Sequence, residues 1–375
     1  MCAAVLPALA KLRLAFLYRD CPGSSMEAMT EETMSETNEG RAVPPPVAIM
    51  NTIYGMMLTF AMRAAAELEI ADLVAGGPRS VGELARVTGA QERTLYRILR
   101  ALAGAGVFAE LSERRFGLTP TSHFLRKDVP GSLRDWVRLA GADWNVAALG
   151  SLLDCARTGK DGYEISKGMR MFDWFEGQAE ARQIFDSAMT SVSSLTVPAI
   201  VATYDFSGIG SIVDVAGGHG ALLAAILEGN PGLSGTLFDV PSVISGARSS
   251  GPLTAPGLAD RVAFVEGDFF QAVPPGHDAY IMKWIVHDWN DEQARQLFRV
   301  CRKAMDKGKR LLIAETIVEE GNLDAKVMDL AMMSATGGIE RTEAEYRALL
   351  EATGFAVARV VRNGSPMSVL EAIAV

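Results

Sequence analysis

The last part of the chain alternates between short apolar runs and helical stretches, and this alternation restricts the fold most. From Ser211 onward, most runs of apolar and branched residues are followed by a stretch with helical spacing. The predicted strands are 211–215, 235–239, 262–266, 279–285 and 310–316. Because strand–helix–strand units pair their strands in parallel through right-handed crossovers, we predict an α/β fold with a mostly parallel sheet.

Two further strand-like runs, 355–361 and 368–374, close the chain. Between them lies Asn363-Gly364, a pair typical of the tight two-residue turn of a β-hairpin. We therefore predict a terminal antiparallel hairpin.

A different pattern precedes the sheet. Ser80 and Glu83 have the spacing of a capping box, and Gly89 ends the helix that they begin. A second amphipathic helix is predicted over 91–105, and strand-like residues within 107–119 flank a charged turn. Helix, turn, helix and hairpin in this order predict a winged-helix arrangement.

Composition excludes several classes of protein. The chain has 375 residues, of which 49% are hydrophobic and 22% charged, as in a globular protein with room for two domains. Its formal net charge of -9 gives no general attraction to nucleic acid. Its four cysteines show no CxxC spacing. We therefore expect neither a structural zinc nor a disulfide framework, and a reducing cytoplasmic location.

The first 46 residues are predicted to be a disordered leader. The apolar run from Met1 to Tyr18 is interrupted by Lys11 and Arg13 and is too short to span a bilayer. The residues that follow are acidic and polar, and they end in three consecutive prolines. We expect this segment to have no folded role and the protein to have no membrane association.

The turn after the first strand of the sheet carries three glycines, Gly217, Gly218 and Gly220. Glycine permits positive φ and removes the Cβ that would keep a ligand away from the backbone. In a doubly wound sheet this turn lies at the carboxyl edge, where ligands bind. Asp239 ends the second strand and could accept hydrogen bonds from ribose hydroxyls. A dinucleotide-binding turn would need a small residue where Leu223 stands.

The third strand is followed by an acid and an aromatic residue, Asp268 and Phe269. The acid could accept a hydrogen bond from the exocyclic amine of an adenine, and the ring could cover one face of the base. Each signal alone is weak. Three signals in register on successive strands predict a nucleoside-containing cofactor.

One histidine, His287, follows the fourth strand at the same edge as the glycine turn. Histidine is the side chain best suited to accept a proton at neutral pH, because its reference pKa is about 6.5. A single histidine beside tryptophan is otherwise a core residue bonded to backbone. Asn290 and Gln293 have the spacing of a helix cap that would fix the loop carrying His287. A base beside a cofactor predicts a group-transfer enzyme.

These segments together resemble the S-adenosylmethionine-dependent O-methyltransferases of the plant and bacterial natural-product type, which act on caffeate, hydroxyneurosporene, phenazines or anthracyclines. The resemblance covers about residues 47 to 375. It rests on DVAGGHG, LFDVPSV, GDFF, KWIVHDWND and GGIERTEAEYRALLEATGF, which follow one another in this order. One departure is Ala216, where the family usually has its first glycine. Alanine is small, so we expect it to be tolerated.

The resemblance implies roles for residues that the patterns alone do not assign. It implies that Glu315 and Glu340 flank His287 as catalytic carboxylates, one of which orients the imidazole and stabilises its protonated form. It implies that S-adenosylmethionine is the cofactor. The cofactor-binding residues that it implies are Gly217, Gly218, Asp239, Asp268, Phe269, Lys283, Met189 and Ser193.

The resemblance also implies an architecture and partners. We expect a class I methyltransferase Rossmann-like sheet and an N-terminal helical winged-helix dimerisation domain, which would make the protein a homodimer. The expected segments are a leader (1–46), the dimerisation domain (47–130), a helical linker and substrate-pocket region (131–205) and the cofactor-binding domain (206–375). The acceptor would be an aromatic hydroxyl compound of secondary metabolism.

No metal is expected. No group of histidine and acidic residues shows metal-ligand spacing in the sequence, and a histidine base does not require a cation, unlike the catechol-type methyltransferases that use one. Asp288 is assigned a structural or substrate-facing role, and His219 is taken as a loop residue. Candidates to line an apolar acceptor cavity, each equally expected in a plain core, are Trp144, Phe172, Trp174, Met332 and Met333.

Two alternatives remain open. Arg93, Arg97 and Arg100 share a face of the second winged-helix helix, within a segment rich in basic residues, which would suit a DNA-binding regulator. The continuous apolar stretch 53–70 argues instead for a dimer surface. The second alternative keeps the fold and the cofactor but performs other chemistry, as some family members do. Those members tend to lack the histidine base.

Overall fold

The computed structural model describes residues 43–362 and 367–375. They fall into two compact units, one ending at Ser132 and the other beginning at Leu133. Most of the predicted leader and the Asn363-Gly364 turn lie outside the described residues. The first described helix begins at Pro45, inside the segment that we expected to be leader, because two prolines occupy first-turn positions that need no amide donor.

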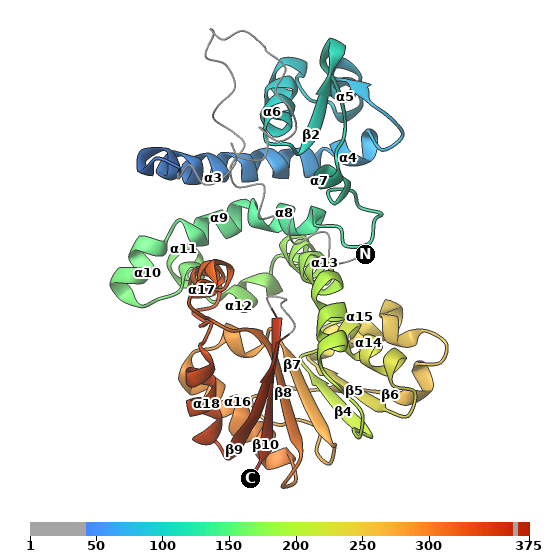
Figure 1. Ribbon diagram of the computed structural model, residues 1–375, viewed down its shortest axis with the longest axis vertical. Coiled ribbons are helices and arrows are strands. Elements are labelled where there is room, and N and C mark those ends of the chain that lie inside the picture. The colour runs from blue at the N-terminus through green and yellow to red at the C-terminus, as the bar shows by residue number, and fades with distance from the viewer. Residues whose placement is uncertain (1–42, 363–366) are drawn as a thin grey trace, which may run out of the picture. The chain divides into compact units, whose positions relative to one another are not determined.

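The N-terminal unit is a winged helix, as predicted. Its small antiparallel sheet has the strand order β1-β3-β2. Ser80 and Glu83 form the expected capping box, and Gly89 ends the helix in the left-handed conformation. The elements are α3 (Pro45–Glu67), α4 (Ile70–Leu73), β1 (Arg79–Ser80), α5 (Val81–Thr88), α6 (Glu92–Gly104), β2 (Phe108–Leu111), η2 (Ser112–Arg114), β3 (Arg115–Leu118) and α7 (Pro120–His123) (Figure 1).

Helix α6 separates a buried apolar face from an exposed basic one. Leu95, Leu99 and Leu102 are buried, whereas the three arginines singled out in the sequence are exposed. The guanidinium of Arg100 lies 5.4 Å from the ring centroid of Tyr96, where it is already engaged in a cation–π contact.

Helix α3 exposes a row of large apolar side chains. They are Ile49, Met50, Ile53, Tyr54, Met56, Met57 and Phe60. Within the described part of the chain, α3 and α13 (Ala179–Thr203) are also long and apolar enough to cross a membrane by length and composition alone. This criterion does not separate a membrane span from an interface or core helix.

The C-terminal unit is built on a seven-stranded sheet with the order β6-β5-β4-β7-β8-β10-β9. Its first five strands in this order are parallel, and β10 is antiparallel to both of its neighbours. Both the parallel sheet and the terminal antiparallel strand pair were predicted. The strands are β4 (Ser211–Val215), β5 (Ser234–Asp239), β6 (Val262–Glu266), β7 (Ala279–Lys283), β8 (Arg310–Thr316), β9 (Phe355–Val361) and β10 (Met367–Ala374).

Strand β7 is shorter than predicted. We expected it to run to residue 285, but it ends at Lys283. Trp284 has a φ of 54°, which turns the chain out of the extended conformation directly after the strand. The apolar residues 284–286 therefore belong to the loop that carries His287.

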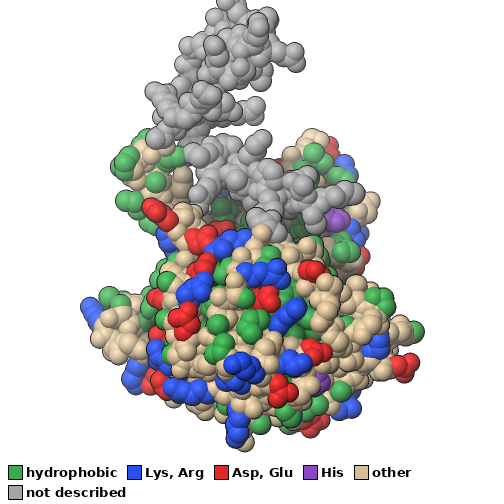
Figure 2. Space-filling model, turned by 60° about the horizontal axis from the view of Figure 1, so that its bottom comes forward, with side chains coloured by type: hydrophobic (Ala, Val, Ile, Leu, Met, Phe, Trp, Pro, Cys, Tyr) green, Lys and Arg blue, Asp and Glu red, His purple; other side chains and the backbone are tan. Residues whose placement is uncertain are grey.

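Both faces of the sheet are covered by apolar side chains, as is typical of a parallel sheet. On β4, Ile212 packs in the core on one face and Val213 in the core on the other. The helices and 3-10 turns between the strands are α14 (Ala221–Gly229), α15 (Pro241–Ser250), η3 (Pro252–Thr254), η4 (Ala259–Arg261), η5 (Val286–Asp288), α16 (Asp291–Ala304) and α18 (Glu343–Glu351). On the face drawn in Figure 2, acidic and basic side chains are interspersed, and neither sign forms one continuous patch.

Further helices lie beyond the carboxyl ends of the parallel strands (Figure 1), and the last part of α13 also packs on one face of the sheet through Val197 and Ile200. They are α8 (Arg134–Ala140), α9 (Asp143–Leu149), α10 (Leu152–Thr158), α11 (Gly162–Lys167), α12 (Met171–Glu176), α13 and α17 (Leu323–Ala335). Trp144, Phe172 and Trp174, which we proposed as cavity residues, are partly buried against a core that includes Tyr163 and Phe175. These side chains form an aromatic cluster on α9, α11 and α12.

The glycine turn contains one residue in a strained conformation. Ala216 has a φ of 56°, a left-handed conformation that costs a residue with a Cβ about 1–2 kcal/mol. At Gly217 the space for a Cβ is taken, because it would lie 2.5 Å from the carboxyl carbon of Asp214. Alanine at the first position of the turn therefore carries a conformational cost.

We predict that Ala216→Gly raises the free energy of unfolding by about 0.5 kcal/mol, because the relieved strain exceeds the entropy that glycine adds to the unfolded chain. Urea unfolding monitored by tryptophan fluorescence measures the difference. Ala225→Gly, in the interior of α14, is the matched control and should lower stability by about 1 kcal/mol. Equal destabilisation by both substitutions would contradict the strain at Ala216.

Candidate active site

The glycine turn and the end of β5 are joined through Asp239. Its carboxylate accepts hydrogen bonds from the amides of Gly218 (2.9 Å) and Val240 (2.7 Å). Burial raises the pKa of Asp239, and these two hydrogen bonds oppose the rise. The turn and the acid thus meet at the carboxyl edge of the sheet, as the sequence predicted.

Two ionisable residues next to this turn, Asp214 and Lys283, have shifted pKa values. Asp214 is buried on β4, and burial raises its pKa to about 7, against the charge of Lys283. Burial lowers the pKa of Lys283 to about 8, against the charges of Asp214 and Glu315. The Lys283 ammonium donates to Ser193 Oγ at 3.0 Å, which links β7 to α13. Met189 lies half-buried one turn earlier on α13.

Asp268 and Phe269 follow β6 at the same edge. Asp268 accepts from the amide of Phe270 (2.8 Å) and from the side chain of Gln271 (3.0 Å), so its carboxylate is held in place by its own loop. The Phe269 ring centroid lies 4.8 Å from that of Phe270 and 5.8 Å from that of Trp289. An acid beside an aromatic wall could hold a purine base.

The residues at this edge fit a nucleoside cofactor that also carries a charged amino-acid end. Asp214 Oδ2 is buried and has no hydrogen-bond partner among the described residues, so it could accept from a ligand. Gly217 brings the backbone to the same point without a Cβ. Asp239 retains lone pairs for ribose hydroxyls, and Ser193 and Lys283 lie alongside.

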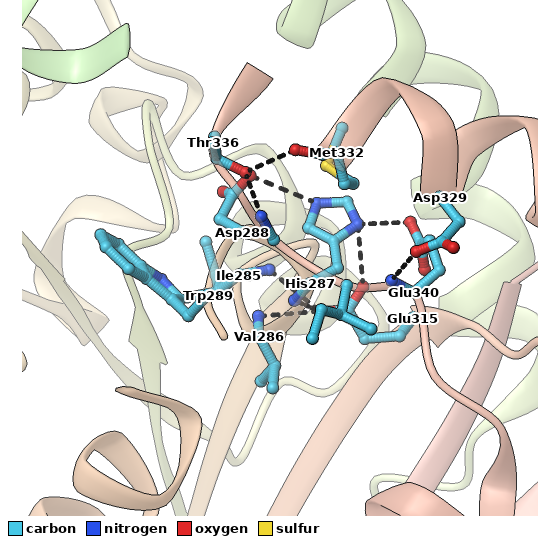
Figure 3. Close-up of polar contacts among 12 residues, drawn as sticks. Ile285, Val286, His287, Asp288, Trp289, Glu315, Asp329, Met332, Thr336 and Glu340 are labelled. Atoms are coloured by element: carbon cyan, nitrogen blue, oxygen red, sulfur yellow. Dashed lines mark hydrogen bonds and ion pairs between the residues drawn. The ribbon is translucent and has the colours of Figure 1, made fainter. Parts of the chain in front are cut away.

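The second half of the site is centred on His287, in η5 directly after β7. Its Nδ1 lies 2.7 Å from Glu340 Oε1 and 3.5 Å from Glu315 Oε2. The side chain of His287 is 8% exposed, and those of the two glutamates are 0–1% exposed, so water does not screen the contact. Figure 3 shows both carboxylates on the same side of the imidazole. The three residues predicted to be catalytic are therefore in contact.

The charges around His287 shift its protonation. Burial lowers the pKa of His287, but the charge of Glu315 and the hydrogen bond to Glu340 outweigh burial and raise it to about 10. Burial raises the pKa of Glu315 to about 7 and that of Asp288 to about 6, against the charge of His287. His287 therefore retains at neutral pH a proton that an isolated imidazole would mostly lose.

Glu315 has a second task that the sequence did not indicate. Its Oε1 accepts the backbone amides of Ile285 (3.0 Å) and Val286 (2.9 Å), which fixes the start of the His287 loop. The end of the loop is fixed by the predicted cap, since Asn290 and Gln293 form a capping box on α16.

Asp329 is a further residue that sequence reasoning missed. Its Oδ1 accepts the backbone amide of Glu340 at 2.9 Å, so a residue of α17 holds the backbone of the residue whose carboxylate contacts His287. An aspartate within a helical stretch carries no sequence signal for this contact. Asp288, in contrast, lies on the other side of the ring, with Oδ1 3.9 Å from His287 Nε2.

The tertiary structure also brings together a group that the sequence spacing did not predict. His287, Glu315 and Glu340 offer potential metal-ligand atoms within 4.8 Å of one another. Two ligands of one tetrahedral zinc at about 2.0 Å would stand roughly 3.3 Å apart. The 2.7 Å between Nδ1 and Oε1 is shorter and is the length of a charge-assisted hydrogen bond. The geometry favours a proton at this position.

Comparison with known protein families identifies one domain in each of the two units of the chain. The model of an O-methyltransferase domain matches residues 149–356, and that of an O-methyltransferase dimerisation domain matches residues 50–128. The phenazine O-methyltransferase of Lysobacter antibioticus is 37% identical over 341 residues, which cover 90% of this chain and 99% of the relative. The mitomycin 6-O-methyltransferase of Streptomyces lavendulae is 35% identical over 353 residues, covering 93% and 96%.

Solved structures show the same fold. The crystal structure of LaPhzM superposes with a TM-score of 0.84 at 36% identity and covers 89% of this chain and all of the other. The neocarzinostatin O-methyltransferase NcsB1, in complex with S-adenosylmethionine and a naphthoic acid, has a TM-score of 0.74 at 32% identity, covering 84% and 96%.

One relative carries another activity in its name. The aclacinomycin 10-hydroxylase of Streptomyces purpurascens is 30% identical over 343 residues, which cover 88% of this chain and 91% of the relative. Both family models nevertheless match in the expected order, and relatives of this kind align over nearly their whole length. The chain therefore belongs to the S-adenosylmethionine-dependent O-methyltransferases that carry an N-terminal dimerisation domain.

Proposed function

We propose that the protein transfers a methyl group from S-adenosylmethionine to a phenolic or enolic hydroxyl of a small aromatic secondary metabolite, with His287 as the general base. The observation that carries this proposal is the 2.7 Å contact between His287 Nδ1 and Glu340, next to the cofactor edge of the sheet. Methyl transfer is an in-line displacement, so it depends on positioning and on a competent nucleophile. S-adenosylmethionine, when bound, supplies an electrophilic methyl group on a positively charged sulfur.

The hydrogen bond to Glu340 selects the useful tautomer of His287. When Nδ1 donates to the carboxylate, Nε2 of the neutral ring carries the free lone pair. In Figure 3, Nε2 points away from both glutamates, toward Asp288 and Thr336. A hydroxyl on that side can give its proton to Nε2, and the two glutamates stabilise the imidazolium that forms.

The raised pKa of His287 suits a phenolic acceptor. A free phenol has a pKa of about 10, close to the value of about 10 that the carboxylates give His287. Proton transfer between two groups of similar pKa is nearly balanced in free energy. At pH 7 a histidine with this pKa is mostly protonated, so only a small fraction of the protein carries His287 as the neutral base. Activity should therefore increase with pH.

The aromatic cluster supports a planar acceptor. Phe172 stacks on Trp289 with 27° between the ring planes and 6.4 Å between their centroids, near the His287 loop. Met332 lies on the Nε2 side of His287 in Figure 3. Two of the relatives are named for the O-methylation of phenazine and of 3-amino-4-hydroxybenzoate, and we extend an aromatic acceptor to this chain.

We predict that His287→Asn lowers kcat for methyl transfer by about 100-fold or more, because the acceptor loses its base. Transfer of labelled methyl to a panel of phenols measures the rate, and titration with S-adenosylhomocysteine should show unchanged cofactor affinity. His277→Asn, which changes a histidine outside the site, is the matched control. Unchanged transfer by His287→Asn would remove the base from the mechanism. A cofactor-bound protein that hydroxylates acceptors instead would favour the chemistry named for the hydroxylase relative.

The pH dependence provides a second prediction. Only neutral His287 can accept a proton, so kcat/KM should rise with pH along a limb displaced above pH 6.5. Glu340→Gln removes one negative charge and should move this limb to lower pH, while Glu351→Gln, at an exposed position of α18, should leave it unchanged. Rate profiles between pH 6 and pH 10 measure the displacement. A limb at the same pH in Glu340→Gln would contradict the assigned contact.

We propose that the protein is a homodimer through its N-terminal unit, acts in the cytoplasm and binds neither nucleic acid nor membrane. The exposed apolar side chains of α3 are the surface that a second copy would cover. The matched dimerisation domain supports this arrangement.

Light scattering should therefore give twice the mass of one chain. The double substitution Ile53→Asp and Met57→Asp should shift the mass toward the monomer, because it places two charges in an apolar contact. Val87→Asp, at an exposed apolar residue of α5, is the control and should remain dimeric. A monomeric wild-type protein would contradict the proposal.

A further inference from the structure

Arg341 is a completely buried arginine beside the catalytic cluster. Its side chain has no exposed surface, and each guanidinium nitrogen has a partner. Nε donates to Asp291 Oδ1 at 3.0 Å, and Nη1 donates to the carbonyls of Val286 and Ile339, both at 3.1 Å. Nη2 donates to the carbonyl of Trp289 at 2.7 Å.

Two of these carbonyls flank His287. Val286 precedes it and Trp289 follows it by two residues, so one rigid guanidinium spans the loop that carries the imidazole. The carbonyl of His287 itself accepts the amide of Ile339 at 2.8 Å. The segment that contains Glu340 thus holds the loop by donating hydrogen bonds to the carbonyl groups of the loop.

The amide groups of the same loop are held from the opposite side. Glu315 accepts those of Ile285 and Val286, as described above. The packing is close, since a Cβ on Gly338 would overlap the carbonyl oxygen of His287. A carboxylate that binds the amides and a guanidinium that binds the carbonyls leave the loop little freedom to move.

We propose that Arg341 is a positioning residue of the methyl-transfer reaction, which fixes the His287 loop so that Nε2 stays in place against the acceptor hydroxyl. The inference rests on the proposed role of His287 as the base. A misplacement of about 1 Å at a reacting group can cost roughly 100-fold in rate. The residue acts through the loop and does not itself touch the reacting atoms.

Arginine suits this task better than lysine does. Its planar fork presents five donors in fixed directions, whereas an ammonium is a point charge on a flexible stem. A buried ion pair is a weak source of net stability, and Asp291, the carboxylate partner of Arg341, is 53% exposed. The arrangement therefore contributes more to the geometry of the loop than to the free energy of folding.

The experiment compares Arg341→Lys with Arg347→Lys in the full-length protein. Arg347, on α18, also binds one carbonyl group and one carboxylate, but neither of these groups belongs to the His287 loop. We expect kcat to fall by about 10- to 100-fold in Arg341→Lys, with KM for the acceptor and affinity for S-adenosylhomocysteine within about 3-fold. Arg347→Lys should keep wild-type kcat.

A spectroscopic measurement separates positioning from general stability. The chain has four histidines, so the ring signals of His287 can be assigned in nitrogen-15 spectra by their absence in His287→Asn. A displaced loop weakens the contact with Glu340, and the titration midpoint of His287 should move toward about 6.5 in Arg341→Lys. An unchanged kcat, or a fall in kcat with an unchanged midpoint, would overturn the inference.

Gly338→Ala keeps the proposal falsifiable if Arg341→Lys does not fold. The added methyl group displaces the His287 loop while Arg341 is still present. We therefore expect kcat to fall while the affinity for S-adenosylhomocysteine stays nearly unchanged, as in Arg341→Lys. Wild-type kcat in Gly338→Ala would show that loop position does not limit the reaction and would overturn the inference. The proposed function fails separately, if His287→Asn retains full activity.

Discussion

The burial of His287 against two carboxylates, both on the Nδ1 side of its ring, is the interaction on which the rest of the site depends. Buried charges must be paired and hydrogen-bonded, because an unpaired one costs far more than folding can offset. One oxygen of each glutamate is hydrogen-bonded: Glu315 Oε1 accepts two backbone amides, and Glu340 Oε1 contacts the imidazole. The second oxygen of each is buried without a hydrogen-bond partner among the described residues, and the charge of His287 lies beside both. The same contacts that make the charges tolerable also fix the loop that carries the histidine.

The cofactor edge and the base are electrostatically one site. Lys283, at the end of β7, lies between Asp214 on one side and Glu315 on the other, and both raise its pKa against the effect of burial. Glu315 in turn acts on His287. Glu315 therefore acts on both Lys283 and His287, in an interior where water screens little.

Several features could be predicted because they have a local cause. The capping box at Ser80, the left-handed Gly89 and the apolar strands of the sheet follow from the side chains of neighbouring residues. The end of β7 was misplaced, because the positive φ of Trp284 has no local signal in an apolar run. Asp329 was missed for a similar reason, since its partner lies on another element.

The sequence by itself determined the succession of strands and helices along the chain, the glycine turn and the presence of one histidine after the fourth strand. These features are local, because they follow from periodicity and turn chemistry. Its resemblance to a family named Glu315 and Glu340, but not their distances. Only the tertiary structure decided that Glu340, 53 residues from His287, lies 2.7 Å from its ring, and that Arg341 binds the loop around it. Contacts and pKa shifts of this kind depend on burial and on the packing of distant segments, which no local pattern encodes.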